Sequence, residues 1–293
     1  MKFAGTVVLY NPEDSLIENI STYLPIVDTL YVMDNSTKEL DIISKVKEID
    51  KVKYISLDGN KGIAKALKVA TETASQDGYD FLLSMDQDSK FPTEDFEIVK
   101  NYILNNDMSN VGIVAINYHG NEMVYEDNNG QKDCVVSVND IITSGSFVNL
   151  SAYKNIDGYN EELFIDYVDN DLCYQYKVNG FEIRLFPNII LNHKLGNILH
   201  VKFLWYEKDI VVHSALRYYY MYRNFHYLLN HRSSEYVKLL NTKSVDYSGK
   251  YIFRRFLFEK PHFKILKMIR KGIKHGKKGI LGPYQERRKK WEY

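Results

Sequence analysis

Continuous apolar runs alternate with helical segments along the first third of the sequence, and this alternation constrains the fold more than any other feature. The apolar runs are Phe3–Leu9, Thr29–Met33, Val52–Leu57, Phe81–Met85 and Val111–Ile116. The segments between them, such as Ile63–Ala74, have helical spacing. Strands that are apolar throughout, without alternation, are typical of a parallel sheet covered by helices on both faces. We therefore predict an α/β fold with a mostly parallel central sheet.

Polar and acidic residues follow three of these predicted strands directly. They are Asp34, the segment Asp58–Gly62 and the triplet Asp86–Asp88. In an open parallel sheet, ligands bind beyond the carboxyl ends of the strands. Glycines in the second segment would allow the backbone to approach a phosphate or a sugar. The three strand ends therefore predict one ligand site at the edge of the sheet.

The triplet Asp86-Gln87-Asp88 is a candidate metal site, because it places two carboxylates at the end of a buried strand. Carboxylate oxygens suit Mg²⁺ or Mn²⁺, and either ion would neutralise a nucleoside diphosphate. A sugar nucleotide breaks its anomeric bond when this leaving group is stabilised. The alternative is an Asp-rich turn before the next helix, which is the commoner role for such a triplet in isolation.

Two later residues are candidates for the same site. Asp169 lies at the start of a predicted helix that ends at Gly180, and it could take the proton of an acceptor hydroxyl as general base. His193 could complete the metal shell through a neutral imidazole. Each has a structural alternative, since an Asp often caps a helix and a single His is commonly a structural or surface residue.

Six short motifs in this order resemble those of family 2 glycosyltransferases. They are Val8-Leu9-Tyr10-Asn11-Pro12, Asp34-Asn35-Ser36, Asn60-x-Gly62 with Ala64 and Ala66, Asp86-Gln87-Asp88, Thr143-Ser144-Gly145-Ser146 and Asp169-x-Asp171-Leu172-Cys173. The resemblance covers roughly residues 3–230 and implies the GT-A fold. Two further segments, Phe164-Ile165-Asp166-x-Val168-Asp169 and His213-Ser214-x-x-Arg217-x-Tyr219-Tyr220-x-x-Arg223-Asn224, resemble the rhamnosyltransferase branch.

The resemblance implies roles for individual residues. Asp34 would contact the nucleotide base or ribose, Asp88 would be the main metal ligand, and Asp86 would contact ribose or metal-bound water. Asp169 would be the base and His193 a further metal ligand. The remaining donor-binding candidates are Tyr10, Asn11, Asn60, Gly62, Gln87, Ser144, Gly145, Arg217, Tyr220 and Arg223. Two positions depart from the pattern, because Val168 replaces the usual Glu and Ala215 replaces the usual Pro.

A polar stripe is predicted on one helix of the C-terminal third. His213, Arg217, Tyr220 and Asn224 have the spacing of one helix face. The stripe could face the donor diphosphate or the acceptor entrance, or it could pack on the catalytic domain through buried hydrogen bonds. Aromatic residues surround it, so we expect this helix to be buried or to lie at an interface, and a homodimer is one prediction.

Basic residues are concentrated after Arg254, where Glu259, Glu286 and Glu292 are the acidic residues. They mix with apolar residues between Phe253 and Lys278, as in a basic amphipathic helix on an anionic bilayer. The alternative is a solvated helix with one face on the core. Lys plus Arg equals Asp plus Glu at 38 each, and the aromatic residues form no recognisable nucleic-acid platform, so we expect no nucleic-acid partner.

The remaining features predict a cytoplasmic protein that lies peripherally on the inner face of the cell membrane. The two cysteines, Cys134 and Cys173, have no metal or disulfide spacing, and we expect neither a signal peptide nor a membrane span. We predict a GT-A catalytic domain over residues 1–205 and a helical, basic and aromatic region over residues 206–293.

The leading functional hypothesis is an inverting, Mg²⁺- or Mn²⁺-dependent glycosyltransferase. It would transfer L-rhamnose from dTDP-L-rhamnose to a hydroxyl of a lipid-linked or growing cell-surface polysaccharide, with the acceptor on a polyprenyl lipid. The alternatives are a UDP-hexose or UDP-galactofuranose donor, and a non-catalytic sugar-nucleotide-binding scaffold. A nucleotidyltransferase is disfavoured, because Leu9–Asp14 lacks the glycine and basic residues of a phosphate loop.

Overall fold

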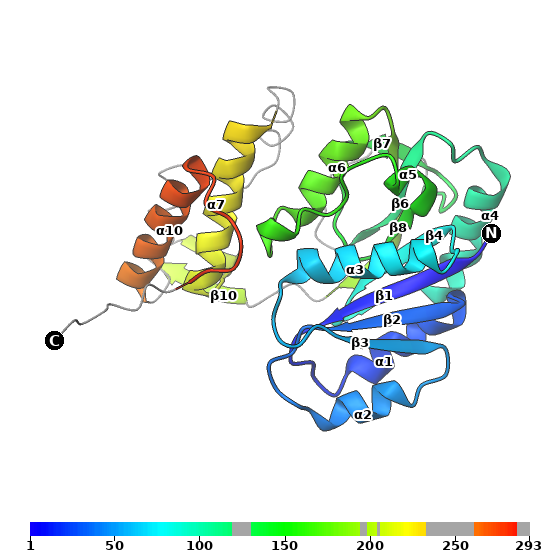
Figure 1. The fold of residues 1–293 in the computed structure, drawn as a ribbon, viewed down its shortest axis with the longest axis horizontal. Helices are drawn as coiled ribbons and strands as arrows, with labels where there is room; N and C mark the ends of the chain where they lie inside the picture. Colours follow the sequence, from blue (N-terminus) through cyan, green and yellow to red (C-terminus); the bar gives the residue numbers. More distant parts are fainter. Residues whose placement is uncertain (119–129, 194–197, 204–205, 233–260, 286–293) are drawn as a thin grey trace.

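A mixed β-sheet with helices on both faces forms the larger part of the computed structural model (Figure 1). The structure describes residues 1–118, 130–193, 198–203, 206–232 and 261–285.

The strands are β1 (Phe3–Leu9), β2 (Thr29–Asp34), β3 (Val52–Ser56), β4 (Phe81–Asp86), β5 (Ser89–Lys90), β6 (Val111–Tyr118), β7 (Val136–Val138), β8 (Ser146–Asn149), β9 (Glu182–His193), β10 (Ile198–Phe203) and β11 (Tyr206–Val211). The helices are α1 (Leu16–Tyr23), α2 (Asp41–Lys47), α3 (Ile63–Gln76), α4 (Phe96–Asn105), α5 (Leu150–Tyr153), α6 (Val168–Val178), α7 (Ala215–His231) and α10 (His262–Lys277), with short 3₁₀ turns η1 (Leu24–Ile26), η2 (Thr93–Asp95) and η3 (Glu161–Leu163).

The strand order in the large sheet is β3-β2-β1-β4-β8-β6-β9-β5, and β7 pairs with β9 outside this path. The first four strands are mutually parallel, as is the pair of β6 and β9. β8 runs antiparallel to both of its neighbours. The predicted α/β fold with a mostly parallel sheet is therefore confirmed, and β8 makes the sheet mixed at its centre.

The two faces of the sheet are covered by different helices, because side chains along a strand alternate between faces. In β1, Phe3, Val7 and Leu9 pack with α1, α2 and α4, whereas Ala4 packs with α3. The α3 face is closed by the small residues Ala66, Ala70 and Ala74, which let that helix lie close to the strands. These apolar clusters fix the strands and therefore the positions of their polar ends.

One segment differs from the sequence prediction, and it follows the long strand β9, which has an irregular register near its middle. Residues 206–211, expected in a helical region, form β11 and pair antiparallel with β10. The predicted division after residue 205 would cut this hairpin, since the hydrogen bonds of β10 and β11 join the two sides.

The C-terminal helices α7 and α10 pack side by side, away from the large sheet (Figure 1). Gly272 and Gly276 of α10 allow the close approach. A Cβ at Gly272 would lie 2.5 Å from the carbonyl oxygen of Tyr219, and one at Gly276 would lie 3.0 Å from Cβ of His226. Tyr218 and Tyr222 pack against Ile265 and Ile269, so these two aromatic residues of α7 lie inside this helix pair. No helix among the described residues is long and apolar enough to cross a bilayer.

Candidate active site

The four parallel strands bring their polar ends to one edge of the sheet. Asp34 pairs in register with Leu9 and with Ser56, and Asp86 pairs with Val8. Asp34 and Asp86 therefore lie on either side of β1, roughly 10 Å apart across two strand spacings. This arrangement is the convergence that the sequence predicted.

The carboxylate of Asp34 is buried and held by two donors. The backbone N–H of Ser36 donates to Oδ1 at 2.8 Å, and the hydroxyl of Tyr54 donates to Oδ2 at 2.6 Å. Burial, together with this bond, raises the pKa of Tyr54 to about 12, so the phenol keeps its proton and stays a donor. Asp34 is thus a fixed acceptor at the end of β2.

Asn35, which the sequence reasoning left out of the site, joins two strand ends. Its backbone N–H donates to the carbonyl oxygen of Leu9 at 2.8 Å. Its side-chain amide donates to the carbonyl of Gly62 and accepts from the N–H of Lys61, both at 2.9 Å. The side chain is 3% exposed. Because both the oxygen and the nitrogen of this buried amide are hydrogen-bonded to backbone groups, Asn35 fixes the turn before α3 against β2.

In the turn at Asn60 and Gly62, the glycine approaches protein backbone, whereas the sequence suggested approach to a phosphate or a sugar. Oδ1 of Asn60 accepts from the N–H of Gly62 at 3.0 Å, and Gly62 has a φ of 88°. A Cβ at Gly62 would lie 2.5 Å from the carbonyl oxygen of Phe164. Because Gly62 has no side chain, a loop of the same chain, residues 162–167, can lie against it. This loop leads into α6.

Gln87 ties β4 to β1 instead of pointing freely from the edge. Its side-chain oxygen accepts from the N–H of Tyr10 at 2.8 Å, and its amide nitrogen donates to the Tyr10 carbonyl at 3.4 Å. The N–H of Asn11 donates to Oγ of Ser36 at 2.9 Å, which joins β1 to β2 in the same way. The side chain of Tyr10 is 49% exposed, so its ring is the part of this segment that a ligand can reach.

The small-residue turn before β8 supports the carboxyl end of β4. Oγ of Ser144 accepts from the N–H of Asp86 at 3.0 Å, and the N–H of Gly145 donates to the carbonyl of Ser84 at 2.9 Å. Gly145 has a φ of 81°, and a Cβ there would lie 2.8 Å from the side chain of Ile116. Ser144 and Gly145 therefore position the backbone of Asp86 from the turn before β8.

The backbone of His193 lies beside the acidic triplet. Asp88 is exposed in the turn between β4 and β5, and Ser89 of β5 pairs in register with His193 of β9. The side chain of His193 lies outside the described part of the structure. The backbones of β5 and of the end of β9 are thus paired although they are about a hundred residues apart in sequence. A shared metal site for Asp88 and His193 requires this proximity.

The residues at this edge suit a divalent cation that a substrate completes. Among the described residues, no three His, Cys, Asp or Glu side chains form a preformed metal cluster. Mg²⁺ is commonly held by one or two carboxylates plus substrate phosphates, with no cage made of protein alone. Asp86 and Asp88 could supply such a pair of carboxylates, so the residues present fit a cation of this kind.

Asp169 lies in the first turn of α6, and the preceding loop reaches the same edge. Its Oδ1 accepts from the N–H of Asn170 at 2.9 Å. The carbonyl of Phe164 in that loop accepts from the N–H of Ala64, at the start of α3, at 3.3 Å. The chain before the candidate base is therefore joined to the turn at Gly62.

Three residues of the predicted polar stripe, Arg217, Tyr220 and Asn224, lie on α7 and make packing contacts, whereas His213 precedes the N-cap Ser214 and is not on the helix. The side chain of Arg223 is fully buried, and that of Tyr220 stacks on Phe164 with ring centroids 4.9 Å apart. Arg217 is about half exposed and donates to Oδ1 of Asp166 at 3.1 Å and 3.2 Å. These contacts favour a positioning role for Tyr220 and Arg223 over the donor contact that the sequence suggested.

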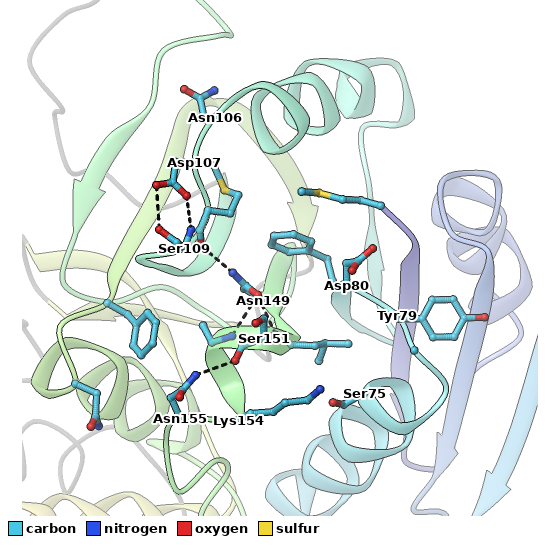
Figure 2. Close-up of a pocket in the computed structure, with 18 residues that line it drawn as sticks. Ser75, Tyr79, Asp80, Asn106, Asp107, Ser109, Asn149, Ser151, Lys154 and Asn155 are labelled. Carbon is cyan, nitrogen blue, oxygen red and sulfur yellow. Dashed lines mark hydrogen bonds between the residues drawn. The ribbon is translucent and has the colours of Figure 1, made fainter.

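A cavity of about 1000 Å³ lies at the opposite edge of the sheet (Figure 2). It is lined by Asp80 before β4 and by Lys154 after α5, among others. Its polar groups bond to one another, since Asp107 accepts from Ser109 and the Asn155 amide donates to the carbonyl of Ser151. None of the predicted site residues lines it, so we do not assign the candidate site there.

Comparison with known proteins identifies the family to which the chain is similar. The sequence profile described as "Glycosyl transferase family 2" matches residues 7–175, which span the sheet edge and Asp169. The dTDP-rhamnosyl transferase RfbF of Shigella flexneri is 28% identical over 257 residues, covering 83% of this chain and 84% of the relative.

Solved structures share the fold. The crystal structure of S. aureus TarS 1-349 matches with a TM-score of 0.54 and 16% identity, over 95% of this chain and 92% of that one. GalNAc-T7 with UDP, GalNAc and Mn²⁺ matches with a TM-score of 0.61 and 11% identity, over 96% of this chain and 56% of that one, so this chain spans about half of it. At these identities the likeness shows the fold alone, and it confirms the predicted GT-A fold.

Replacement of Asn35 by Ala should loosen the site more than it unfolds the protein. The change leaves the Lys61 N–H and the Gly62 carbonyl without their partner, at a cost of about 1–3 kcal/mol. We expect a lower midpoint in urea unfolding and roughly tenfold weaker binding of a nucleoside diphosphate by calorimetry. Asn155→Ala at the opposite edge is the control, and equal binding loss in both variants would remove Asn35 from the site.

Proposed function

The chain belongs to glycosyl transferase family 2, and from this premise we propose that it transfers L-rhamnose from dTDP-L-rhamnose to a saccharide hydroxyl. The observation that carries the donor assignment is the similarity to a dTDP-rhamnosyl transferase over more than four fifths of both chains. The resemblance of residues 164–169 to the rhamnosyltransferase branch supports the same donor. We further propose that the acceptor is a lipid-linked or growing cell-surface polysaccharide.

We propose that transfer is a single in-line displacement that inverts the anomeric carbon. Asp169 takes the proton of the acceptor hydroxyl, because an alcohol is a weak nucleophile near neutral pH. Asp34 and the turn at Asn60 and Gly62 hold the nucleotide portion of the donor at the edge of the sheet. Asp88, with Asp86 and His193, would hold a Mg²⁺ or Mn²⁺ ion, which when bound neutralises the charge of the leaving diphosphate.

The donor identity can be tested by thermal shift with a panel of nucleotide sugars, with and without Mn²⁺ or Mg²⁺. Ligand binding raises the unfolding temperature according to ligand concentration over its dissociation constant. We expect the largest metal-dependent shift with dTDP-L-rhamnose, and we expect Asp88→Ala to remove the metal-dependent part. Equal shifts with UDP-hexoses or UDP-galactofuranose would contradict the rhamnosyl assignment, and no shift with any donor would contradict donor binding itself.

Replacement of Asp169 by Asn tests the proposed base and separates an enzyme from a binding scaffold. The amide keeps the size of the carboxylate but cannot accept the hydroxyl proton. We expect turnover to fall by about 10²–10⁴-fold with the donor dissociation constant nearly unchanged. Transfer is measured by release of dTDP with an acceptor saccharide. Turnover retained in Asp169→Asn would exclude this residue as the base.

We also propose that the exposed face of α10 rests on the inner face of the cell membrane, where a polyprenyl-linked acceptor would lie. The exposed residues of this helix are basic, with Phe263 80% exposed beside them. The sequence from His262 to Gln285 contains no Asp or Glu. Because Ile265, Met268 and Ile269 pack against α7, this contact would be chiefly electrostatic, and the apolar face would not enter the bilayer.

Vesicle flotation can test this surface with the charge-reversed variant Lys267→Glu/Arg270→Glu/Lys274→Glu. Each basic residue near an anionic surface contributes about 1 kcal/mol. We expect wild-type protein to float with phosphatidylglycerol-containing vesicles at low salt, and the variant to stay in the dense fraction. The matched control is Lys2→Glu/Lys45→Glu/Lys154→Glu, with the same change in net charge. Equal loss in both variants would show that overall charge, and not α10, drives binding.

The homodimer remains a prediction without structural support of its own. Of the aromatic residues of α7 that suggested it, Tyr218 and Tyr222 are buried, at 0% and 1% exposure, and they pack on α10. Phe225 and Tyr227 are half-buried in a separate cluster with Leu228.

A further inference from the structure

Three residues in the loop before α6 have left-handed backbone without being glycine. The φ angles are 66° at Phe164 and 65° at both Asp166 and Tyr167. Each such residue is unfavourable by about 1–3 kcal/mol and persists when its surroundings determine it. Tyr167, at the N-terminal boundary of α6, makes no side-chain cap hydrogen bond. This loop, residues 162–167, therefore depends on contacts from elsewhere for its shape.

Asn224 of α7 supplies the most concentrated set of these contacts. Its side-chain amide nitrogen lies 3.0 Å, 2.8 Å and 2.8 Å from the carbonyl oxygens of Leu163, Ile165 and Asp166. The side chain is fully buried. An amide group with two hydrogens serves three carbonyls only when they are turned toward one point, so Asn224 fixes the curvature of the loop.

Arg223 holds both Asn224 and the loop. Its Nε donates to Oδ1 of Asn224 at 2.8 Å, and its Nη2 donates to the carbonyls of Leu163 at 2.7 Å and Glu162 at 3.2 Å. A third nitrogen, Nη1, donates to the carbonyl of Gly282. Burial lowers the pKa of this guanidinium, and these carbonyl acceptors offset the lost hydration.

The loop is thus held between two parts of the molecule. On one side, the carbonyl of Phe164 accepts from Ala64 and packs against Gly62, at the edge where the donor is proposed to bind. On the other side are Arg223 and Asn224. Asp169 follows two residues after the loop, in the first turn of α6. Any movement of the loop would move this carboxylate relative to the turn at Gly62.

We propose that Arg223 and Asn224 are positioning residues that act through the loop to set where Asp169 stands relative to the bound donor. The proposal rests on the proposed function, since it takes Asp169 as the base. It assigns the C-terminal helix pair a share in catalysis through two side chains that are buried against backbone carbonyls of the loop. A base displaced by about 1 Å can lower turnover by about 10²-fold without weakening donor binding.

The chain offers a matched control at the other end of α7. Arg232 donates to both carboxylate oxygens of Asp171 at 2.9 Å, and that carboxylate is 1% exposed. This ion pair also attaches α7 to the catalytic part, but its partner Asp171 is in the first turn of α6, whereas Arg223 and Asn224 bond to carbonyls of the loop itself. Arg232→Ala should therefore weaken the attachment of α7 while the loop keeps its shape.

The experiment compares Asn224→Ala and Arg232→Ala in the full chain by hydrogen–deuterium exchange and steady-state kinetics. In Asn224→Ala we expect faster exchange in residues 162–169, about 10²-fold lower kcat and a donor KM within about threefold of wild type. In Arg232→Ala we expect faster exchange near residues 171–175 and kcat within about threefold of wild type. Arg223→Lys, which keeps the charge but has one nitrogen centre, serves in place of Asn224→Ala if the latter does not fold.

Two results would overturn the proposal. One is unchanged exchange in residues 162–169 of the Asn224 or Arg223 variant, because the loop would then not depend on these residues. The other is an equal loss of kcat in Arg232→Ala, which would show that general attachment of α7 is what matters. If wild-type protein transfers no sugar at all, the proposed function fails, while the exchange data still decide whether the loop is held in this way.

Discussion

Parallel pairing of β3, β2, β1 and β4 is the constraint on which the rest of the structure depends. It sends four strand ends to one edge, and the register places Asp34 and Asp86 on either side of β1. The side-chain amide of Asn35 then joins the end of β2 to the turn before α3, and that of Gln87 joins the end of β4 to the end of β1. The apolar clusters on both faces hold the strands and thereby set the positions of the polar residues at their ends.

A second constraint comes from the C-terminal part of the chain. α7 contributes a buried Arg and Asn to the loop before α6, and α10 packs on α7 through its two glycines. The catalytic part and the helix pair are therefore linked by hydrogen bonds to backbone carbonyls as well as by packing. Under our proposal, a substitution in α7 would act on the candidate base through these bonds.

Much of the fold and part of the site could be predicted from the sequence because both depend on local pattern. Uniformly apolar runs ending in Asp identified the strands and the edge, and small residues at Ala66 and Ala70 suited a helix lying close on the sheet. The insertion of β8 between β4 and β6 has no local signal, since strand order is set by long-range pairing. The β10–β11 hairpin pairs locally, but residues 206–211 contain three consecutive charged residues, Glu207, Lys208 and Asp209, and so lack the uniformly apolar pattern that identified the other strands.

The roles of single polar residues were harder to predict than their presence. Asn224 lies on a helix stripe that could have faced a ligand, and its burial against carbonyl groups depends on the shape of a loop far away in sequence. Asn35 stands in a quoted motif, but its part in joining β2 to the turn at Gly62 is visible only when the strands are paired. Partners far apart in sequence decide whether a polar side chain meets solvent, ligand or backbone.

The most direct measurement is a crystal structure of the protein with dTDP and Mn²⁺, in which anomalous scattering locates the ion. The account predicts one manganese peak beside Asp88, with the diphosphate at the carboxyl end of β4, the nucleoside against Asp34, and Asp169 facing the open side of the diphosphate. Nucleotide bound in the cavity at the opposite edge of the sheet, or an ion remote from Asp88, would contradict it.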